Sequence, residues 1–142
     1  MAENMVLKVD TGAITIDLQD AKGKKIGEFD FNPSDSNIFK RYENVVEFFN
    51  NISFSEDLTE AQQIEEINKI CDSINEQFDY LFGYKVGSSI FGTCGPLTVV
   101  SSGDFFFESV LDGIGNLIEK ITKQRVEKKL AKVRKATAKY NK

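Results

Sequence analysis

The sequence predicts an α+β fold: an N-terminal three-stranded antiparallel β-meander packed on a helical body, with a long basic helix at the C-terminus. Three observations lead to this prediction. Apolar and polar residues alternate within residues 6–31, apolar residues recur every three or four positions through residues 64–81, and basic residues dominate from residue 119. At 142 residues, the length suits one domain. We expect an α+β body at 1–118, with strands within 6–31 and helices at about 34–52, 55–82 and 104–118, and a basic helical tail at 119–142 that continues the last helix.

The predicted sheet comes from three short segments separated by turn residues. Val6–Val9 is short and contains β-branched residues, whereas Ala13–Leu18 and Ile26–Phe31 alternate apolar with polar side chains. The segments Asp10–Gly12 and Asp20–Lys24 carry the Asp and Gly residues that favour turns. A meander of this kind has one apolar face, so a helix is expected to cover it.

The first helix is expected to start within Asn32–Ser36. Pro33 suits a first helical turn, and Asn32, Ser34 or Ser36 is a candidate N-cap. A helical stripe of apolar residues follows, made of Ile38, Tyr42, Val45, Val46, Phe49 and Ile52.

The second helix contains a heptad-like seam. Thr59 and Gln62 have the spacing of a capping box, and Gly83 is expected to end the helix. The seam residues are Ile64, Ile67, Cys71, Ile74, Phe78 and Leu81. This seam is too short for a free-standing coiled coil, but it suits packing along another helix.

A loop rich in Gly and Pro precedes the last helix. Val86–Phe91 allows one helical turn, and Gly92–Pro96 cannot continue it. Ser101–Asp104 is expected to be a loop with an N-cap for the last helix. Phe105–Phe107 then follow in succession, and successive helical residues point about 100° apart. The three rings therefore cannot all face one core, so at least one points outward or packs on the loop or on another chain.

The composition gives no support for an enzyme or a cofactor site. The chain has no His, which is the commonest general base near neutral pH and the commonest zinc ligand. Cys71 and Cys94 lack CxxC spacing, and the glycines fit neither GxxxxGK[ST] nor GxGxxG. We expect reduced thiols, no cofactor, no metal and no catalytic residues.

Charge is strongly divided along the chain. From Glu119 onward there are ten Lys/Arg and two Glu, and the preceding residues hold the remaining eight basic and twenty acidic groups. The tail is interpreted as a solvated helix, a protein-binding helix or a nucleic-acid-binding helix; the acidic body argues against nucleic acid. No apolar run is long enough to span a membrane, and Met1–Asp10 lacks a signal-peptide pattern, so we expect a cytoplasmic protein without membrane association.

Turn and ring residues form a pattern that extends over most of the chain. Its central part is Phe91-Gly92, Gly95-Pro96-Leu97-Thr98, Gly103, Phe106-Phe107-Glu108, Leu111-Asp112 and Ile118-Glu119. Four further features accompany this central part. They are strands ending in Glu28-Phe29-Asp30-Phe31, the helix start Asn32-Pro33-Ser34-Asp35, an acidic middle helix, and a basic helix with Tyr140. With these motifs the chain resembles the tail assembly chaperones of long-tailed phages and prophages of Gram-positive bacteria.

The resemblance implies a non-enzymatic factor in virion morphogenesis. Such chaperones bind the tape measure protein, help the tail tube protein to assemble around it, act in the host cytoplasm and are absent from the mature virion. The alternative is a structural virion component, such as a tail or head-tail connector protein. A nucleic-acid-binding regulator is a third class, and self-association as a homo-oligomer stays open.

Partner contacts are expected from three groups of residues. The seam and the three rings would supply apolar contacts, and the tail would supply electrostatic contacts. The predicted partner-binding residues are Ile64, Ile67, Ile74, Phe78, Leu81, Phe105, Phe106, Phe107, Arg125, Lys128, Lys129, Lys132, Arg134 and Lys135.

Overall fold

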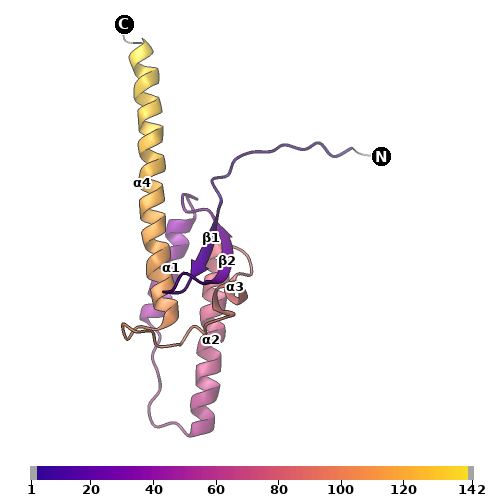
Figure 1. The fold of residues 1–142 in the computed structure, drawn as a ribbon, viewed down its shortest axis with the longest axis vertical. Coiled ribbons are helices and arrows are strands. Elements are labelled where there is room, and N and C mark those ends of the chain that lie inside the picture. Colours follow the sequence, from indigo (N-terminus) through magenta and orange to yellow (C-terminus); the bar gives the residue numbers. More distant parts are fainter. Residues whose placement is uncertain (1–2, 141–142) are drawn as a thin grey trace.

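The computed structural model describes residues 3–140, with side chains described to residue 135. The elements are β1 (Ile14–Gln19), β2 (Lys25–Phe31), α1 (Ile38–Asn50), α2 (Glu60–Phe82), α3 (Gly87–Phe91) and α4 (Phe106–Tyr140). The α+β class is therefore confirmed. The first part of α4 lies beside the body, and the rest projects from it as a single rod (Figure 1).

The sheet is a two-stranded antiparallel hairpin. Ile14 lies opposite Phe31 and Ile16 opposite Phe29, and a register shift follows Leu18. In the turn, the Asp20 carboxylate accepts from the backbone N–H groups of Lys22 and Lys24, each at 2.9 Å. The alternation that predicted these two strands thus reflects one covered face and one exposed face.

The prediction of a third strand at Val6–Val9 is wrong. Within the described residues this segment belongs to no strand and extends away from the body (Figure 1). The chain is held instead at the turn just before β1. There Gly12 N–H donates to Asp10 Oδ1 at 2.8 Å, and Asn32 Nδ2 donates to the Thr11 carbonyl. The first bond forms a turn within residues 10–12, and the second ties this turn to the residue after β2.

Both middle helices start later than the expected positions. Asn32 Oδ1 accepts from Ser34 N–H and Asp35 Oδ1 from Asn37 N–H, so residues 32–37 form turns and α1 begins at Ile38. The expected N-cap residues therefore do not cap it. For α2, the predicted capping box of Thr59 with Gln62 is confirmed, and it sets the first helical residue at Glu60. Gly83 ends α2 in the left-handed conformation, also as predicted.

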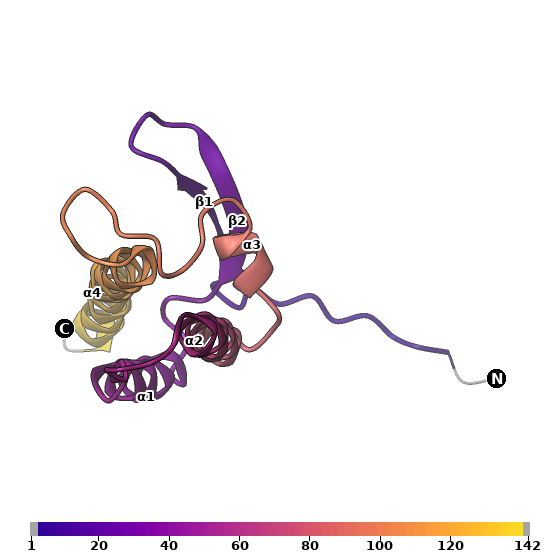
Figure 2. The ribbon, with the colours of Figure 1, turned by 90° about the horizontal axis from the view of Figure 1, so that it is seen from below.

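Rings from several elements form the centre of the core. Phe78 contacts Phe49, Phe82 and Phe91, and the two β2 rings, Phe29 and Phe31, pack on Phe82. Seen from below, α1 and α2 lie side by side, with the hairpin, α3 and α4 around the other side of the core (Figure 2). The core therefore lies between the α1–α2 pair and a layer made of the hairpin, α3 and α4.

The long helix α4 belongs to the core only through about its first third. Its buried residues end at Ile118, and Lys123 and Gln124 are already exposed. The sequence predicted this change, because apolar residues thin out beyond Ile121. Within residues 3–140, no helix is long and apolar enough to cross a membrane.

Candidate protein-binding groove

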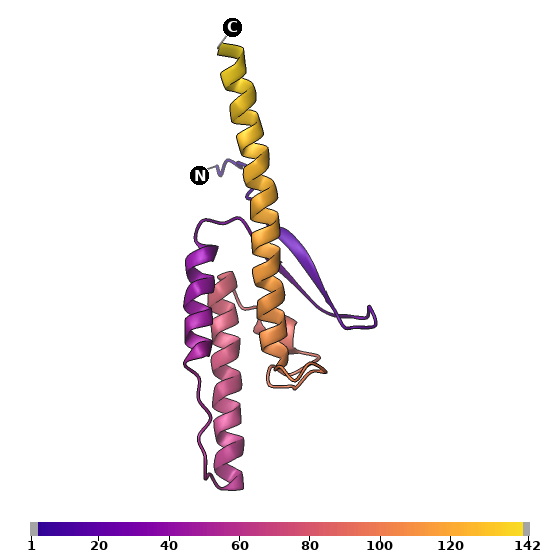
Figure 3. The ribbon, with the colours of Figure 1, turned by 90° about the vertical axis from the view of Figure 1, so that its left-hand side faces the viewer.

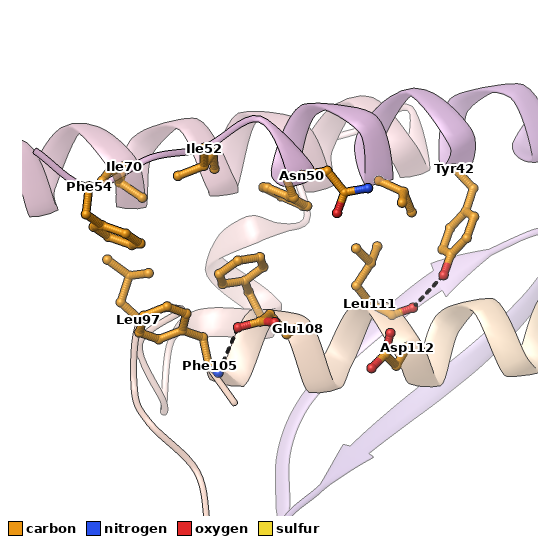
Figure 4. Close-up of a pocket in the computed structure, with 13 residues that line it drawn as sticks. Tyr42, Asn50, Ile52, Phe54, Ile70, Leu97, Phe105, Glu108, Leu111 and Asp112 are labelled. Carbon is orange, nitrogen blue, oxygen red and sulfur yellow. Dashed lines mark hydrogen bonds between the residues drawn. The ribbon is translucent and has the colours of Figure 1, made fainter. Parts of the chain in front are cut away.

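A groove of about 400 Å³ separates the end of α1 from the start of α4. One wall comes from α1, the segment after it and Ile70 of α2; the other comes from the loop before α4 and the first turns of α4 (Figure 4). Its lining residues are Tyr42, Val46, Phe49, Asn50, Ile52, Phe54, Ile70, Leu97, Phe105, Phe107, Glu108, Leu111 and Asp112.

The α1 wall follows from helical spacing. Tyr42, Val46 and Phe49 are four and three residues apart, so they lie on one face, and all three are half-buried. Beyond α1 the chain continues along the groove, where Phe54 is 50% exposed although its ring lies 5.9 Å from that of Phe105. Apolar surface thus remains accessible along this wall.

The α4 wall is fixed by hydrogen bonds at the helix start. Phe106 N–H donates to the Thr98 carbonyl at 2.7 Å, and Phe107 N–H donates to the Pro96 carbonyl at 3.0 Å. The Glu108 carboxylate accepts from Phe105 N–H at 3.1 Å (Figure 4). These bonds satisfy amide groups that a helix leaves unpaired at its start, and they fix where the three phenylalanine rings point.

The three rings divide between two sides of α4. Phe105 and Phe107 are stacked with centroids 6.0 Å apart, and both line the groove. Phe106 turns to the other side, where its ring meets Phe91 edge-on at 6.0 Å. The prediction that the three rings cannot share one face is confirmed. Phe107 is buried, whereas Phe105 and Phe106 keep partial exposure.

Polar groups stand at the α1 end of the groove. The Tyr42 hydroxyl donates to the Leu111 carbonyl at 3.3 Å (Figure 4). Burial, and next the nearby negative charge of Asp112, raise the pKa of Tyr42. Asn50 points into the groove and makes no side-chain hydrogen bond within the described residues (Figure 4). The groove therefore combines an apolar lining with a few groups able to orient a polypeptide.

The predicted α2 seam divides into a buried half and an exposed half. Ile74, Phe78 and Leu81 are each 0% exposed, whereas Ile64 is 58% and Ile67 46% exposed. The lower end of α2 extends past both α1 and α4, and the segment that connects α1 to α2 runs beside it (Figure 3). Ile74, Phe78 and Leu81 have no surface to offer a partner, and this corrects their place among the contact residues.

The predicted tail residues also differ in role. Arg125 donates to Ser34 Oγ at 2.6 Å and to Asn32 Oδ1 at 3.5 Å, so it anchors α4 to the body. The other predicted contact residues of the tail are exposed and form no ion pair within the described residues: Lys128, Lys129, Lys132, Arg134 and Lys135. Val126 and Leu130 form an apolar strip among them, at 50% and 47% exposure.

The groove is lined mainly by apolar side chains, with Tyr42, Asn50, Glu108 and Asp112 as its polar groups. The part of the chain that the structure describes has no cluster of His, Cys, Asp and Glu able to hold a metal ion. Sequence reasoning did not identify Tyr42, Asn50 or Leu97 as site residues. The helical stripe had placed Tyr42 in the core, and no local signal marks Asn50 or Leu97 as groove residues.

Comparison with known proteins finds no matching family model, no matching curated protein and no matching solved structure. The features that bear on function are therefore the groove, the exposed ends of α2 and α4, and the motif resemblance in the sequence.

Proposed function

We propose that this chain is a non-enzymatic chaperone of phage tail assembly, and that the groove between α1 and α4 binds a helix of the tape measure protein. The observation that carries the proposal is the groove lined by the partly exposed rings of Phe49, Phe54 and Phe105, with the buried ring of Phe107 packed on Phe49 at 4.7 Å. An amphipathic helix places its apolar face into a groove through anchors three or four residues apart. The sequence resemblance to tail assembly chaperones supports the identity of the client.

The exposed half of α2 extends the apolar surface beyond the groove. Ile64 and Ile67 lie on the part of α2 that follows Phe54 in the chain. A long helical client that leaves the groove can continue along this seam by side-chain packing of the coiled-coil type. Each large apolar side chain buried in this way stabilises the complex by about 1.5–3 kcal/mol.

The exposed basic residues of α4 supply a second, weaker kind of contact. Lys128, Lys129 and Lys132 stand on a helix that projects from the body, within reach of an acidic stretch of a client or of the tail tube protein. Contacts between exposed charges are screened by salt and contribute little each. Weak contacts of this kind allow the client to dissociate. A chaperone that is absent from the finished particle has to dissociate from its client.

The test is co-expression with the tape measure protein of the same phage or prophage. Asn50→Trp fills the groove from an exposed position, and Asn51→Trp places the same ring on the neighbouring residue, which does not line the groove. We expect the wild type and Asn51→Trp to keep the client soluble and to co-purify with it, and Asn50→Trp to reduce co-purification about tenfold. A client that stays equally soluble without this chain would refute the chaperone role.

The structural alternative is tested with purified particles. A tail or connector protein is retained in the mature virion, whereas a chaperone is absent. Detection of this chain at a fixed copy number per particle would replace the proposed function by the structural one.

A further inference from the structure

We propose that the N-terminal arm, Met5–Val9, adds as a third strand to the free edge of β1 in a second copy of this chain. The arm would lie in a second groove, between β1 and α4, on the side of α4 opposite the client groove. This inference concerns self-association and does not rest on the proposed function.

The arm is an apolar segment with no contact to its own chain's sheet. Met5 is 96% exposed, Val6 80%, Leu7 86% and Val9 69%, and no hydrogen bond joins residues 3–9 to the rest of the described chain. An extended segment of this composition has strand propensity and a large apolar surface in water. It therefore gains free energy by joining a sheet.

Only one edge of the hairpin is open. The outer side of β2 is occupied, because Asp30 N–H donates to the Tyr84 hydroxyl at 2.7 Å and the Thr93 hydroxyl donates to the Ile26 carbonyl at 3.1 Å. Among the described residues, the backbone of β1 pairs only with β2. Alternate backbone groups of β1 therefore point away from β2 without a protein partner, as in any edge strand.

A groove of about 480 Å³ borders this open edge. Four consecutive β1 residues, Ile16–Gln19, line it together with Phe29 of β2, so the groove reaches both the edge of β1 and the covered face of the sheet. On α4 the lining consists of residues on one helical face: Phe106, Ser109, Val110, Gly113, Ile114 and Leu117. A Cβ at Gly113 would meet no atom within 4 Å, which means that the groove is open above this residue.

The arm matches this groove in length and in its alternation of side chains. Its five residues span about 16 Å as a strand, slightly less than the six residues of β1. With period two, Met5, Leu7 and Val9 point to one side and face α4, while Lys8 points to the outer side. On that outer face Asp17 and Glu28 are cross-strand neighbours, and Lys25 already pairs with both, at 3.5 and 3.2 Å.

The arm is directed away from its own groove. The turn before β1 is held by the Asn32–Thr11 bond, and Arg125 lies against Gly12. From there the arm leaves on the side of the molecule opposite to α4, and the views in Figures 1 and 2 agree on this. Each copy thus offers one arm and one vacant edge, which gives a closed pair if the exchange is reciprocal and an open chain if it is not.

The test is sedimentation of the full chain over a range of concentrations. The arm variant Leu7→Ser/Val9→Ser removes two inward side chains, and Val6→Ser is its control on the outward side. The groove variant Gly113→Phe fills the space above α4, and Gly113→Ala is its control. We expect concentration-dependent self-association of the wild type and of both controls, and a dissociation constant about tenfold or more higher for the arm and groove variants.

A mixing experiment separates this mechanism from a general loss of folding. The arm variant keeps an intact groove, and the groove variant keeps an intact arm, so an equimolar mixture should form a one-to-one complex at concentrations where each variant alone is mostly monomeric. A monomeric wild type, equal self-association of all variants, or a mixture that stays monomeric would each overturn the proposal.

Discussion

At the scale of single residues, two glycines of α4 have opposite surroundings. Gly113 faces open space, whereas a Cβ at Gly115 would collide with the Tyr42 hydroxyl. Gly115 therefore allows α1 and α4 to approach at the point where Tyr42 bonds to the Leu111 carbonyl. The two glycines look equivalent in the sequence, but only Gly115 is needed for a close contact between two helices.

The pair Gly113→Ala and Gly115→Ala tests this difference. Both changes bring the same gain in helix propensity, about 0.5–1 kcal/mol, so it cancels in the comparison. Because only the second change displaces Tyr42, Gly115→Ala should be less stable than Gly113→Ala by about 1–3 kcal/mol in denaturant unfolding. Equal stabilities would mean that Tyr42 does not pack on Gly115.

Tyr42 is also a reporter of the groove. Burial and the charge of Asp112 raise its pKa, so ionisation should occur above the ordinary value of about 10. The corresponding stability is fully present below pH of about 10 and is lost as the pH rises through the raised pKa. The difference in ultraviolet titration between the wild type and Tyr42→Phe isolates this group. A midpoint at or below 10 would show that Tyr42 is not buried in the groove wall.

At the scale of elements, α2 shows what the sequence could and could not predict. Its capping box at Thr59 and Gln62 and its end at Gly83 were predicted correctly, because these signals are local, whereas the expected start near residue 55 was five residues too early. The division of its seam was not predicted, because it depends on where α1 ends. The helix α1 has 13 residues and α2 has 23, so part of α2 has no partner helix.

Substitutions along this seam should separate into two classes. Ile74→Ala removes a side chain that is 0% exposed and should destabilise the fold by about 2–5 kcal/mol. Ile67→Ala, at 46% exposure, should change stability by less than about 0.5 kcal/mol and weaken client binding instead. Thermal unfolding and client co-purification measure the two effects. A large loss of stability for Ile67→Ala would place this residue in the core.

Two truncations of α4 test where its anchored part ends. Removal of residues 128–142 leaves the Arg125–Ser34 bond and the 2.9 Å bond from Thr122 to the Pro33 carbonyl in place. This truncation should leave the unfolding temperature within a few degrees of the wild type, whereas removal of residues 120–142 should lower it clearly, because both bonds are lost. Similar unfolding temperatures for both truncations would contradict the anchor.

At the scale of the whole molecule, both proposed binding sites arise from segments that are distant in the sequence. The client groove joins residues near 42–54 to residues near 97–112, and the arm groove joins β1 to α4. Periodicity predicted which elements form, but it holds no information about which faces meet. The third strand was mispredicted for a related reason: its composition favours a strand, but it does not say whether a sheet edge lies within reach.

The most direct test of the central claim is site-specific photocrosslinking to the tape measure protein. A benzoylphenylalanine replaces Asn50, which is exposed and points into the client groove, and a control replaces Lys22 in the hairpin turn (Figure 4). We predict a crosslinked adduct with the tape measure protein from position 50 and none from position 22. The absence of an adduct from position 50, or equal adducts from both positions, would contradict the assignment of this groove to a helical client.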